Sequence, residues 1–494
     1  MERKTPIFYS AIMLTGVNLL LRFVGTSFQV YLSGRIGASG IGLLQLTLSV
    51  GTMAMVAGMG GIRTATMYLT AEELGQRKPQ NVRCVLSGCF LYSILFSGAI
   101  ALLLYRFAPQ IGQYWIGDQR TVPALQLFAA FLPCSCLCGV MTGYFTAANR
   151  IGTLAAVEVA EQILSMAVTL SALSLWGSAD PGKACLCVVL GSSIGACFTL
   201  VCLVGLRLRE TCVSAPRIPV ASRLCKTALP LAAADDLRTG ISTLENLMVP
   251  QRLALNRTTA DPLAAFGMIS GMVFPVLMFP ACILFGLAEL LIPELARCAA
   301  TKSTQRISYL VSRSLKVALL YGLTFGGLIY LLARPLCLRL YQNSEAGSYL
   351  RLYALLIPML YCDAITDAMI KGLGQQTASV RYNIFTNILD IFLLYLLLPV
   401  WGMKGYFLSF LVTHLINFFL SVRRLIRISE TTVPLPIPLF SILAAICSIW
   451  ITAHIRTPLL LLLVYPIVFF CLLTLTQVLS REDAAWINGL LRKK

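Results

Sequence analysis

Polar and ionisable side chains recur at helical spacing inside long apolar segments of this chain. In residues 7–32 they lie three or four positions apart, which places them on one face of a helix: Thr15, Asn18, Arg22, Thr26 and Gln29. Arginine stays charged when it is buried, and its planar guanidinium can bind two phosphate oxygens at once. This segment contains no acidic residue. We therefore expect Arg22 to bind a ligand or an anionic group on another helix.

Two further stripes combine cations with acids. One consists of Asp235, Arg238, Ser242 and Glu245, and the other of Asp363, Asp367 and Lys371. A charge at mid-bilayer costs at least ~2.5–3.5 kcal/mol, so these groups should face protein or water. An alternative is that the charges on each helix simply neutralise one another. The predicted substrate-binding residues are Arg22, Arg238, Glu245, Asp363, Asn18 and Gln29.

The composition shows which elements must position these side chains. Of 494 residues, 57% are hydrophobic and only 12% are charged, about half the ~25% usual in a globular protein. This excludes a soluble or disordered chain and predicts an all-α polytopic membrane protein. About fourteen segments reach the ~20 apolar residues that a membrane-crossing helix needs: 7–32, 41–66, 84–105, 122–146, 153–176, 184–206, 227–249, 263–292, 310–333, 350–372, 380–400, 404–422, 435–455 and 457–479.

The net charge of +18 is best explained by membrane orientation. If the N-terminus is cytoplasmic, most Lys and Arg fall in cytoplasmic segments, which predicts that both ends lie inside. The clusters are Arg207/Arg209/Arg217/Arg223/Lys226, Arg297/Lys302/Arg306/Arg313/Lys316 and Arg423/Arg424/Arg427. Contact with anionic lipid is the alternative role of such clusters. Nucleic-acid binding is not expected.

An internal repeat organises the chain. Gly42 corresponds to Gly267, and Pro133 corresponds to Pro358 at the same offset. The repeat predicts two six-helix lobes of the same orientation, residues 1–206 and 227–425, joined by a cytoplasmic linker at 207–226. Two more helices and a tail follow at 426–494. Repeats of this kind commonly place a substrate site between the halves near mid-membrane.

Ordered motifs along nearly the whole chain carry a family resemblance. They are Gly40-Ile-Gly-Leu-Leu-Gln, Gly60-Gly-Ile-Arg-Thr-Ala, Ala71-Glu72, Glu161-Gln162, Val249-Pro-Gln-Arg-Leu253, Phe279-Pro280 and Ile370-Lys-Gly-Leu-Gly-Gln375. The set resembles the stage V sporulation protein B (SpoVB)-like polysaccharide flippases of the multidrug/oligosaccharidyl-lipid/polysaccharide (MOP) superfamily, which are related to MurJ. The resemblance implies a V-shaped arrangement of two lobes around a central cavity, plus two C-terminal helices.

The resemblance also implies a function. MurJ-like flippases use cavity arginines to bind the pyrophosphate of an undecaprenyl-linked sugar, and Arg22-Phe-Val-Gly25 matches their first-helix motif. The next arginine of that motif is absent, since Phe28 and Gln29 stand there, and this departure weakens an assignment to lipid II itself. The resemblance further implies that residues 435–479 form a groove for the polyprenyl tail.

Three functions follow as hypotheses. The first is an alternating-access flippase for an undecaprenyl-pyrophosphate-linked oligosaccharide or peptidoglycan precursor, acting in spore cortex or polysaccharide biosynthesis as a monomer in the cytoplasmic membrane. The second is a cation-coupled multidrug antiporter, which would favour an acidic cavity. The third is a membrane glycosyltransferase or polymerase. The acidic residues of the predicted external loops are isolated from one another, which argues against this enzyme. The sequence contains only two histidines, which argues against a metal site. No cofactor is expected, and coupling to H⁺, Na⁺ or the membrane potential stays open.

Overall fold

The computed structural model describes residues 7–76, 79–176, 180–208, 220–257, 259–431, 436–455 and 457–479. Within these ranges the chain is helical almost throughout and contains no β-strand. The helices form two compact units. Unit 1 contains the described residues of Met1–Gly271 and Leu394–Gly402, and unit 2 contains those of Met272–Leu393 and Met403–Lys494.

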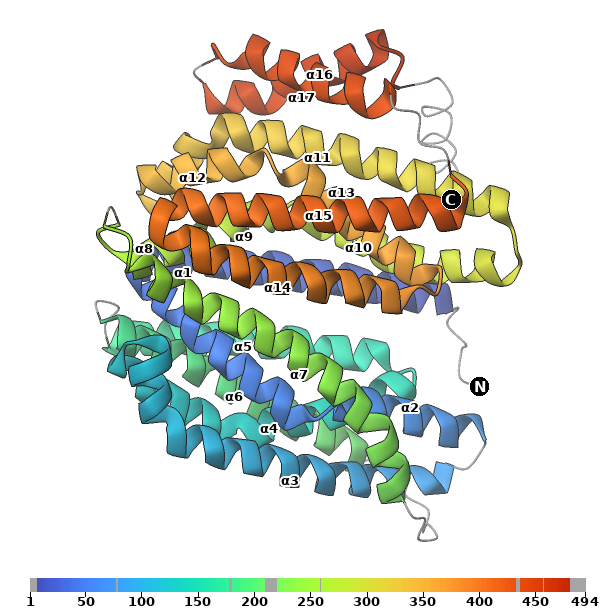
Figure 1. The fold of residues 1–494 in the computed structure, drawn as a ribbon. Coiled ribbons are helices and arrows are strands. Elements are labelled where there is room, and N and C mark those ends of the chain that lie inside the picture. The colour runs from blue at the N-terminus through green and yellow to red at the C-terminus, as the bar shows by residue number, and fades with distance from the viewer. Residues whose placement is uncertain are drawn as a thin grey trace. The chain divides into compact units, whose positions relative to one another are not determined.

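Unit 1 is built from the N-terminal helices (Figure 1). Its elements are α1 (Ile7–Met59), α2 (Ile62–Gly75), α3 (Pro79–Gln110), η1 (Ile111–Ile116), η2 (Gln119–Thr121), α4 (Val122–Ala147), α5 (Ile151–Trp176), α6 (Pro181–Leu208), α7 (Val220–Leu253) and α8 (Pro262–Gly267). The α1 helix contains the predicted span 7–32 and most of the span 41–66, which ends in α2. Between them the non-helical residue Gly37, with φ 80°, kinks α1. Glycine adopts this conformation without the penalty that a Cβ would bring.

Unit 2 continues with broken and bent helices. The element η3 (Met268–Val273) leads into it, and its helices are α9 (Phe274–Met278), α10 (Ala281–Ala300), α11 (Thr304–Tyr341), α12 (Ser344–Ala354), α13 (Ile357–Gly372), α14 (Gln376–Trp401), α15 (Met403–Ser429), α16 (Pro436–Thr452) and α17 (Pro458–Leu475). The last turns of α14, from Leu394 onward, belong to unit 1. The chain bends by 63° before α10 and by 56° between α12 and α13. Pro280 and Pro358 accompany these bends, because proline cannot donate a helical hydrogen bond.

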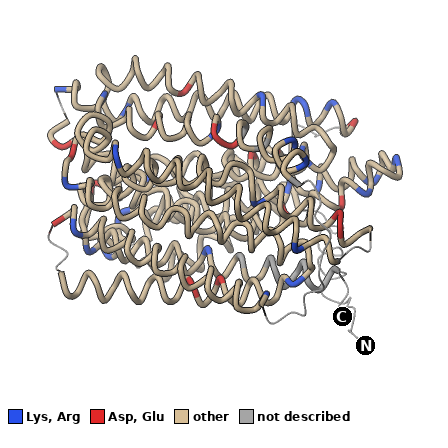
Figure 2. The backbone as a smooth tube through the Cα atoms, turned by 90° about the horizontal axis from the view of Figure 1, so that it is seen from below, with Lys and Arg blue, Asp and Glu red and all other residues tan. Residues whose placement is uncertain are grey.

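The predicted all-α polytopic membrane fold is confirmed. In the described ranges, nine helices are long and apolar enough to cross a membrane, or up to eleven if each bent pair is one span. Every predicted span coincides with a helix, part of α1–α2, or a bent pair. The α7 helix is not among the nine, because charged side chains interrupt its apolar surface: Asp235, Asp236, Arg238 and Glu245. Lys and Arg gather toward the ends of the helices (Figure 2).

The repeat-related glycines meet inside unit 1. A Cβ added at Gly42 would lie 2.4 Å from the Leu263 carbonyl oxygen, and one at Gly267 would lie 2.0 Å from that of Ala38. Only glycine permits this crossing of α1 and α8. The α7 helix also packs within unit 1, against α1 and α2. The sequence-based division at 206, 226 and 425 stays a prediction.

Candidate functional site

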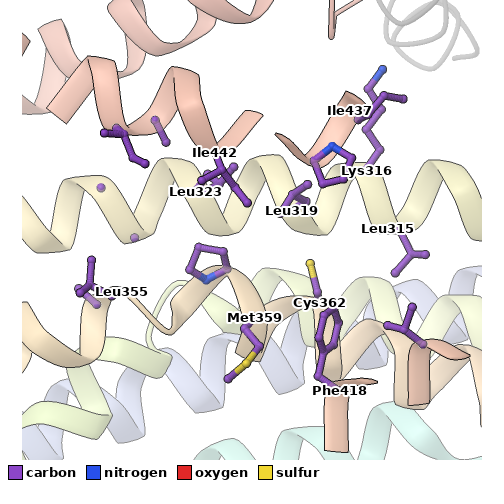
Figure 3. A pocket seen from close by; sticks show the side chains of 18 of the residues that line it. Leu315, Lys316, Leu319, Leu323, Leu355, Met359, Cys362, Phe418, Ile437 and Ile442 are labelled. Atoms are coloured by element: carbon purple, nitrogen blue, oxygen red, sulfur yellow. The ribbon is translucent and has the colours of Figure 1, made fainter. Parts of the chain in front are cut away.

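A cavity of about 940 Å³ opens in unit 2 among α11, α12, α13, α15 and α16. We call it the α11–α16 cavity. Its walls are mainly aliphatic, with Leu319 and Leu323 of α11, Phe418 of α15 and Ile442 of α16 around the same space (Figure 3). An elongated space with such walls favours a hydrocarbon chain, because burying apolar surface stabilises by ~25 cal/mol per Å².

The bend between α12 and α13 forms one wall of this cavity. Leu355 lies at the break and Met359 one turn later, and both line the cavity. Pro358 packs against α11 so closely that a Cβ at Gly322 would lie 2.7 Å from the Pro358 Cα. Leu355 and Met359 are four positions apart, so they lie on the same side of the chain and both face this wall of the cavity.

The α16–α17 hairpin covers the cavity from the other side. The fully buried Tyr465 of α17 anchors the hairpin, since its hydroxyl donates a 3.0 Å hydrogen bond to the Leu323 carbonyl of α11. The ring lies directly over Gly327, where an added Cβ would meet the hydroxyl oxygen at 1.9 Å. This close packing keeps Ile437 and Ile442 of α16 above the α11 residues (Figure 3).

One end of the cavity is basic. Arg313 and Lys316 belong to its lining, together with Tyr309 and Ser312. Figure 3 shows Lys316 beside Ile437, where α16 begins, with Leu355 at the other end of the view. The cavity is therefore amphipathic along its length.

Asp363 belongs to a second polar group in unit 2. Its Oδ2 accepts a 3.0 Å hydrogen bond from Asn417 Nδ2, while its Oδ1 and Asn417 Oδ1 are buried with no hydrogen-bond partner in the structure. Buried oxygen acceptors without a hydrogen-bond partner favour binding of a proton or a small cation. Asp367, in contrast, is paired with Lys371 at 2.5 Å and with the Ser379 hydroxyl.

Sequence reasoning did not identify the α15 partners of these acids. Asp390 is 8% exposed, and its Oδ1 accepts hydrogen bonds from Ser409 at 2.6 Å and Thr413 at 3.2 Å. These hydroxyls and Asn417 recur at four-residue spacing along α15, which places them on one helix face. That spacing was the signal that could have revealed them.

The other predicted site residues belong to unit 1. The side chains of Arg22 on α1 and Arg238 on α7 are both exposed, while Gln29 and Glu245 are half-buried. The side chain of Asn18 lies outside the described residues. A Cβ at Gly25 would lie 3.9 Å from Gln162 Nε2 of α5, so polar groups of α5 approach the α1 stripe. Asp363 belongs to unit 2.

Asn246 and Thr243 extend the polar contacts between α1 and α7. Asn246 Nδ2 donates to the Ser49 hydroxyl at 3.0 Å, and the Thr243 hydroxyl donates to the Ser49 carbonyl at 3.2 Å. Thr243 and Asn246 are three positions apart and share one face of α7, and these bonds hold that face against α1.

An ion-pair network at one end of unit 1 was also missed. Arg223 of α7 binds Glu73 at 2.8 Å and Glu72 at 2.9 Å, both on α2. The Glu73 side chain is only 3% exposed and also accepts a 2.8 Å hydrogen bond from Asn81. The hydrogen bonds to Glu73 and Glu72 raise the pKa of Arg223. The network connects the start of α7 to α2.

Comparisons with known proteins define the protein family to which the chain belongs. The family model MatE matches residues 14–177 and 252–396, which is more than half of the chain. The chain therefore belongs to the MatE family. It has a MOP fold, since it is similar to an inward-facing multidrug resistance MATE family transporter of the MOP superfamily, with a TM-score of 0.68 and 12% identity over 85% of this chain and 99% of the other.

Individual proteins within this fold and family are also similar to the chain. Stage V sporulation protein B of Bacillus subtilis (strain 168) is 20% identical over 81% of this chain and 80% of its own length. Sporulation protein YkvU of the same organism is 21% identical over 61% of this chain and 68% of its own length. The lipid II flippase MurJ, in an inward closed conformation, has a TM-score of 0.70 and 13% identity over 97% of this chain and 100% of its own. The predicted family resemblance is confirmed.

Proposed function

We propose that this protein flips an undecaprenyl-pyrophosphate-linked saccharide across the cytoplasmic membrane by alternating access. The α11–α16 cavity is the observation that carries the proposal. An apolar cavity of about 940 Å³ suits a long hydrocarbon chain, and α16 contributes one of its walls. The similarity to stage V sporulation protein B supports a role in sporulation, and we propose a precursor of the spore cortex or of another polysaccharide as the cargo.

The extent of the structural similarity supports a flippase over a drug transporter. The MurJ chain covers 97% of this chain, whereas the inward-facing MATE transporter covers 85%. A lipid-linked substrate needs a place for its tail during transport, and a compact drug does not. The α16–α17 hairpin, which closes the cavity, supplies that place.

Arg22 is proposed to bind the pyrophosphate. Moving a phosphate through a low-dielectric region requires fixed cations that replace its water. Arg22 is exposed on α1 and presents the bidentate fork that suits two phosphate oxygens. Arg238 on α7 is also exposed and would assist. Asn18 and Gln29 belong to the same helix as Arg22, and Glu245 belongs to the same helix as Arg238.

A cation-coupled antiporter is the second candidate function. The buried Oδ1 atoms of Asp363 and Asn417, which have no hydrogen-bond partner among the described residues, and the hydroxyl-bound Asp390 support this candidate because they offer acceptors for H⁺ or Na⁺. The same groups could equally couple a flippase to an ion gradient. We further propose that the protein is a monomer with both termini in the cytoplasm. We also propose that it is not an enzyme and that it does not bind nucleic acid.

Reconstituted proteoliposomes distinguish the two functions. The purified chain is supplied with a fluorescent undecaprenyl-pyrophosphate-linked saccharide or a fluorescent organic cation, and movement is followed under imposed H⁺ or Na⁺ gradients. We expect movement of the lipid-linked saccharide above that of protein-free vesicles. Transport of the organic cation without movement of the lipid would support the antiporter and refute the flippase.

A further inference from the structure

One face of α15 combines apolar side chains with two arginines near the end of the helix. Its residues recur at three- and four-residue steps: Phe419, Val422, Arg423, Ile426 and Arg427. These five residues line a groove of about 460 Å³, which we call the α15 groove. The packed face of the helix is a different one, and its residues in the same turns are buried: Asn417, Ser421, Leu425 and Ser429. The α15 groove therefore lies on the less covered side of the helix.

The length of α15 places the two arginines at the level of lipid headgroups. From Met403 to Arg423 the helix rises about 30 Å, at 1.5 Å per residue. The hydrocarbon core of a bilayer is also about 30 Å thick. A membrane-crossing α15 with Met403 at one boundary therefore brings Arg423 and Arg427 to the phosphates of the opposite leaflet. Phe419, whose side chain is 65% exposed, stays at the level of the acyl chains.

The two arginines of the groove carry uncompensated charge. Both are exposed, and neither forms an ion pair or a hydrogen bond with any residue that the structure describes. Arg424, on the same turn, is half-buried and donates a 2.6 Å hydrogen bond to Gln375. The exposed Arg306 and Arg297 also differ, since they bind Glu294 at 2.6 Å and 3.9 Å. The α15 groove thus presents two cations to a ligand from outside the described chain.

Membrane orientation alone does not require this alignment. An orientation signal needs only positive charge near the end of a span. In the α15 groove the cations share one helix face with apolar side chains that lie nearer the membrane centre. The acid nearest to them in sequence, Glu430, follows the last residue of α15. A phospholipid has its phosphate and its acyl chains at the same two depths, so the groove is complementary to it in charge and in polarity.

We propose that the α15 groove binds one anionic diacyl phospholipid of the phosphatidylglycerol type. Its phosphate would lie between Arg423 and Arg427, which are neighbours on the helix surface because they are four positions apart. Guanidinium groups bind phosphate oxygens through paired, charge-assisted hydrogen bonds. One acyl chain would cover Phe419, Val422 and Ile426 and bury their apolar surface. The inference goes beyond the proposed transport activity and holds for any cargo.

Native mass spectrometry of the full-length protein in a neutral detergent tests the site. The protein is titrated with phosphatidylglycerol or with phosphatidylcholine of the same acyl chains, so that the two lipids differ only in the headgroup. Two arginines near a lipid phosphate should favour phosphatidylglycerol about 30-fold for the first lipid bound. We expect R423Q/R427Q to lose most of this preference while its affinity for phosphatidylcholine is unchanged, which also shows that it is folded. The matched variant R297Q/R306Q removes two charges that Glu294 already pairs, and it should keep the preference.

Several outcomes would overturn the inference. The site is refuted if wild-type protein shows no preference, if R423Q/R427Q keeps it, or if R297Q/R306Q loses as much of it. An equal loss of both lipids in R423Q/R427Q would show that the arginines support the fold and not a headgroup. Displacement of phosphatidylglycerol by inorganic phosphate at equal concentration would identify a site for free phosphate. Displacement by undecaprenyl phosphate at a far lower concentration would assign the groove to a polyprenyl lipid and overturn the phospholipid assignment.

Discussion

Replacing Gly327 with alanine should release the α16–α17 hairpin from α11. The new Cβ would lie 1.9 Å from the Tyr465 hydroxyl oxygen and 2.2 Å from its Cζ, so the whole ring must move by more than 1 Å to reach ordinary contact at ~3.5 Å. Overpacking of this kind costs about 1–3 kcal/mol. The displaced ring also loses its hydrogen bond to Leu323, which contributes about 0.5–1.5 kcal/mol. We expect a total loss of about 2–4 kcal/mol.

Unfolding in detergent, followed by circular dichroism, measures this loss, and a double-mutant cycle assigns it. In a Y465A background the clash is gone, so G327A should add little further destabilisation. Gly98 on α3 is the matched control, since a Cβ there meets nothing within 4 Å. G98A should therefore stabilise by about 0.5–1 kcal/mol. Equal destabilisation by G327A in both backgrounds would refute the proposed anchoring of the hairpin by Tyr465.

Three other changes probe separate parts of the structure. R223Q removes the ion-pair partner of the buried Glu73 carboxylate, so thermal unfolding should show a loss of about 1–3 kcal/mol; R297Q, whose own side chain is exposed, should stay within about 1 kcal/mol, and equal losses would contradict the role of burial. Deletion from residue 436 onward should leave membrane insertion of the preceding helices intact and weaken binding of long-chain more than short-chain polyprenyl lipids; an equal loss for both would indicate a purely structural hairpin. D363N should abolish the dependence of transport on the H⁺ or Na⁺ gradient, and an unchanged dependence would exclude this acid as the coupling group.

The fold could be predicted largely from the sequence because apolar segment length is a direct requirement of the bilayer. All predicted spans coincide with helices. Gly42 and Gly267, which the predicted repeat relates, meet in the structure, while the repeat itself stays a prediction. The π-helical turns Ile111–Ile116 and Met268–Val273 were not predicted, because their residues are as apolar as those of ordinary helices.

The site was less predictable, for a related reason. Polar stripes identify a helix face, but they do not identify its partner, so Asn417, Ser409 and Thr413 were missed beside the acids they contact. The cavity residues Leu319, Leu355 and Ile442 carry no signal, since apolar side chains are expected at every position of a membrane helix. The roles of Arg22, Arg238, Glu245, Gln29, Asn18 and Asp363 in substrate binding stay predictions.

The initial rate of lipid-linked saccharide flipping by Arg22→Ala in proteoliposomes tests the central claim most directly. We expect R22A to abolish flipping while expression and membrane insertion stay normal, and R22K to recover part of the rate, because an ammonium replaces the bidentate guanidinium with a point charge. A contrary mechanism is that Arg22 only pairs with an acid on another helix. Restoration of flipping in R22A by a second-site change of an acid to a neutral residue would contradict the headgroup role of Arg22.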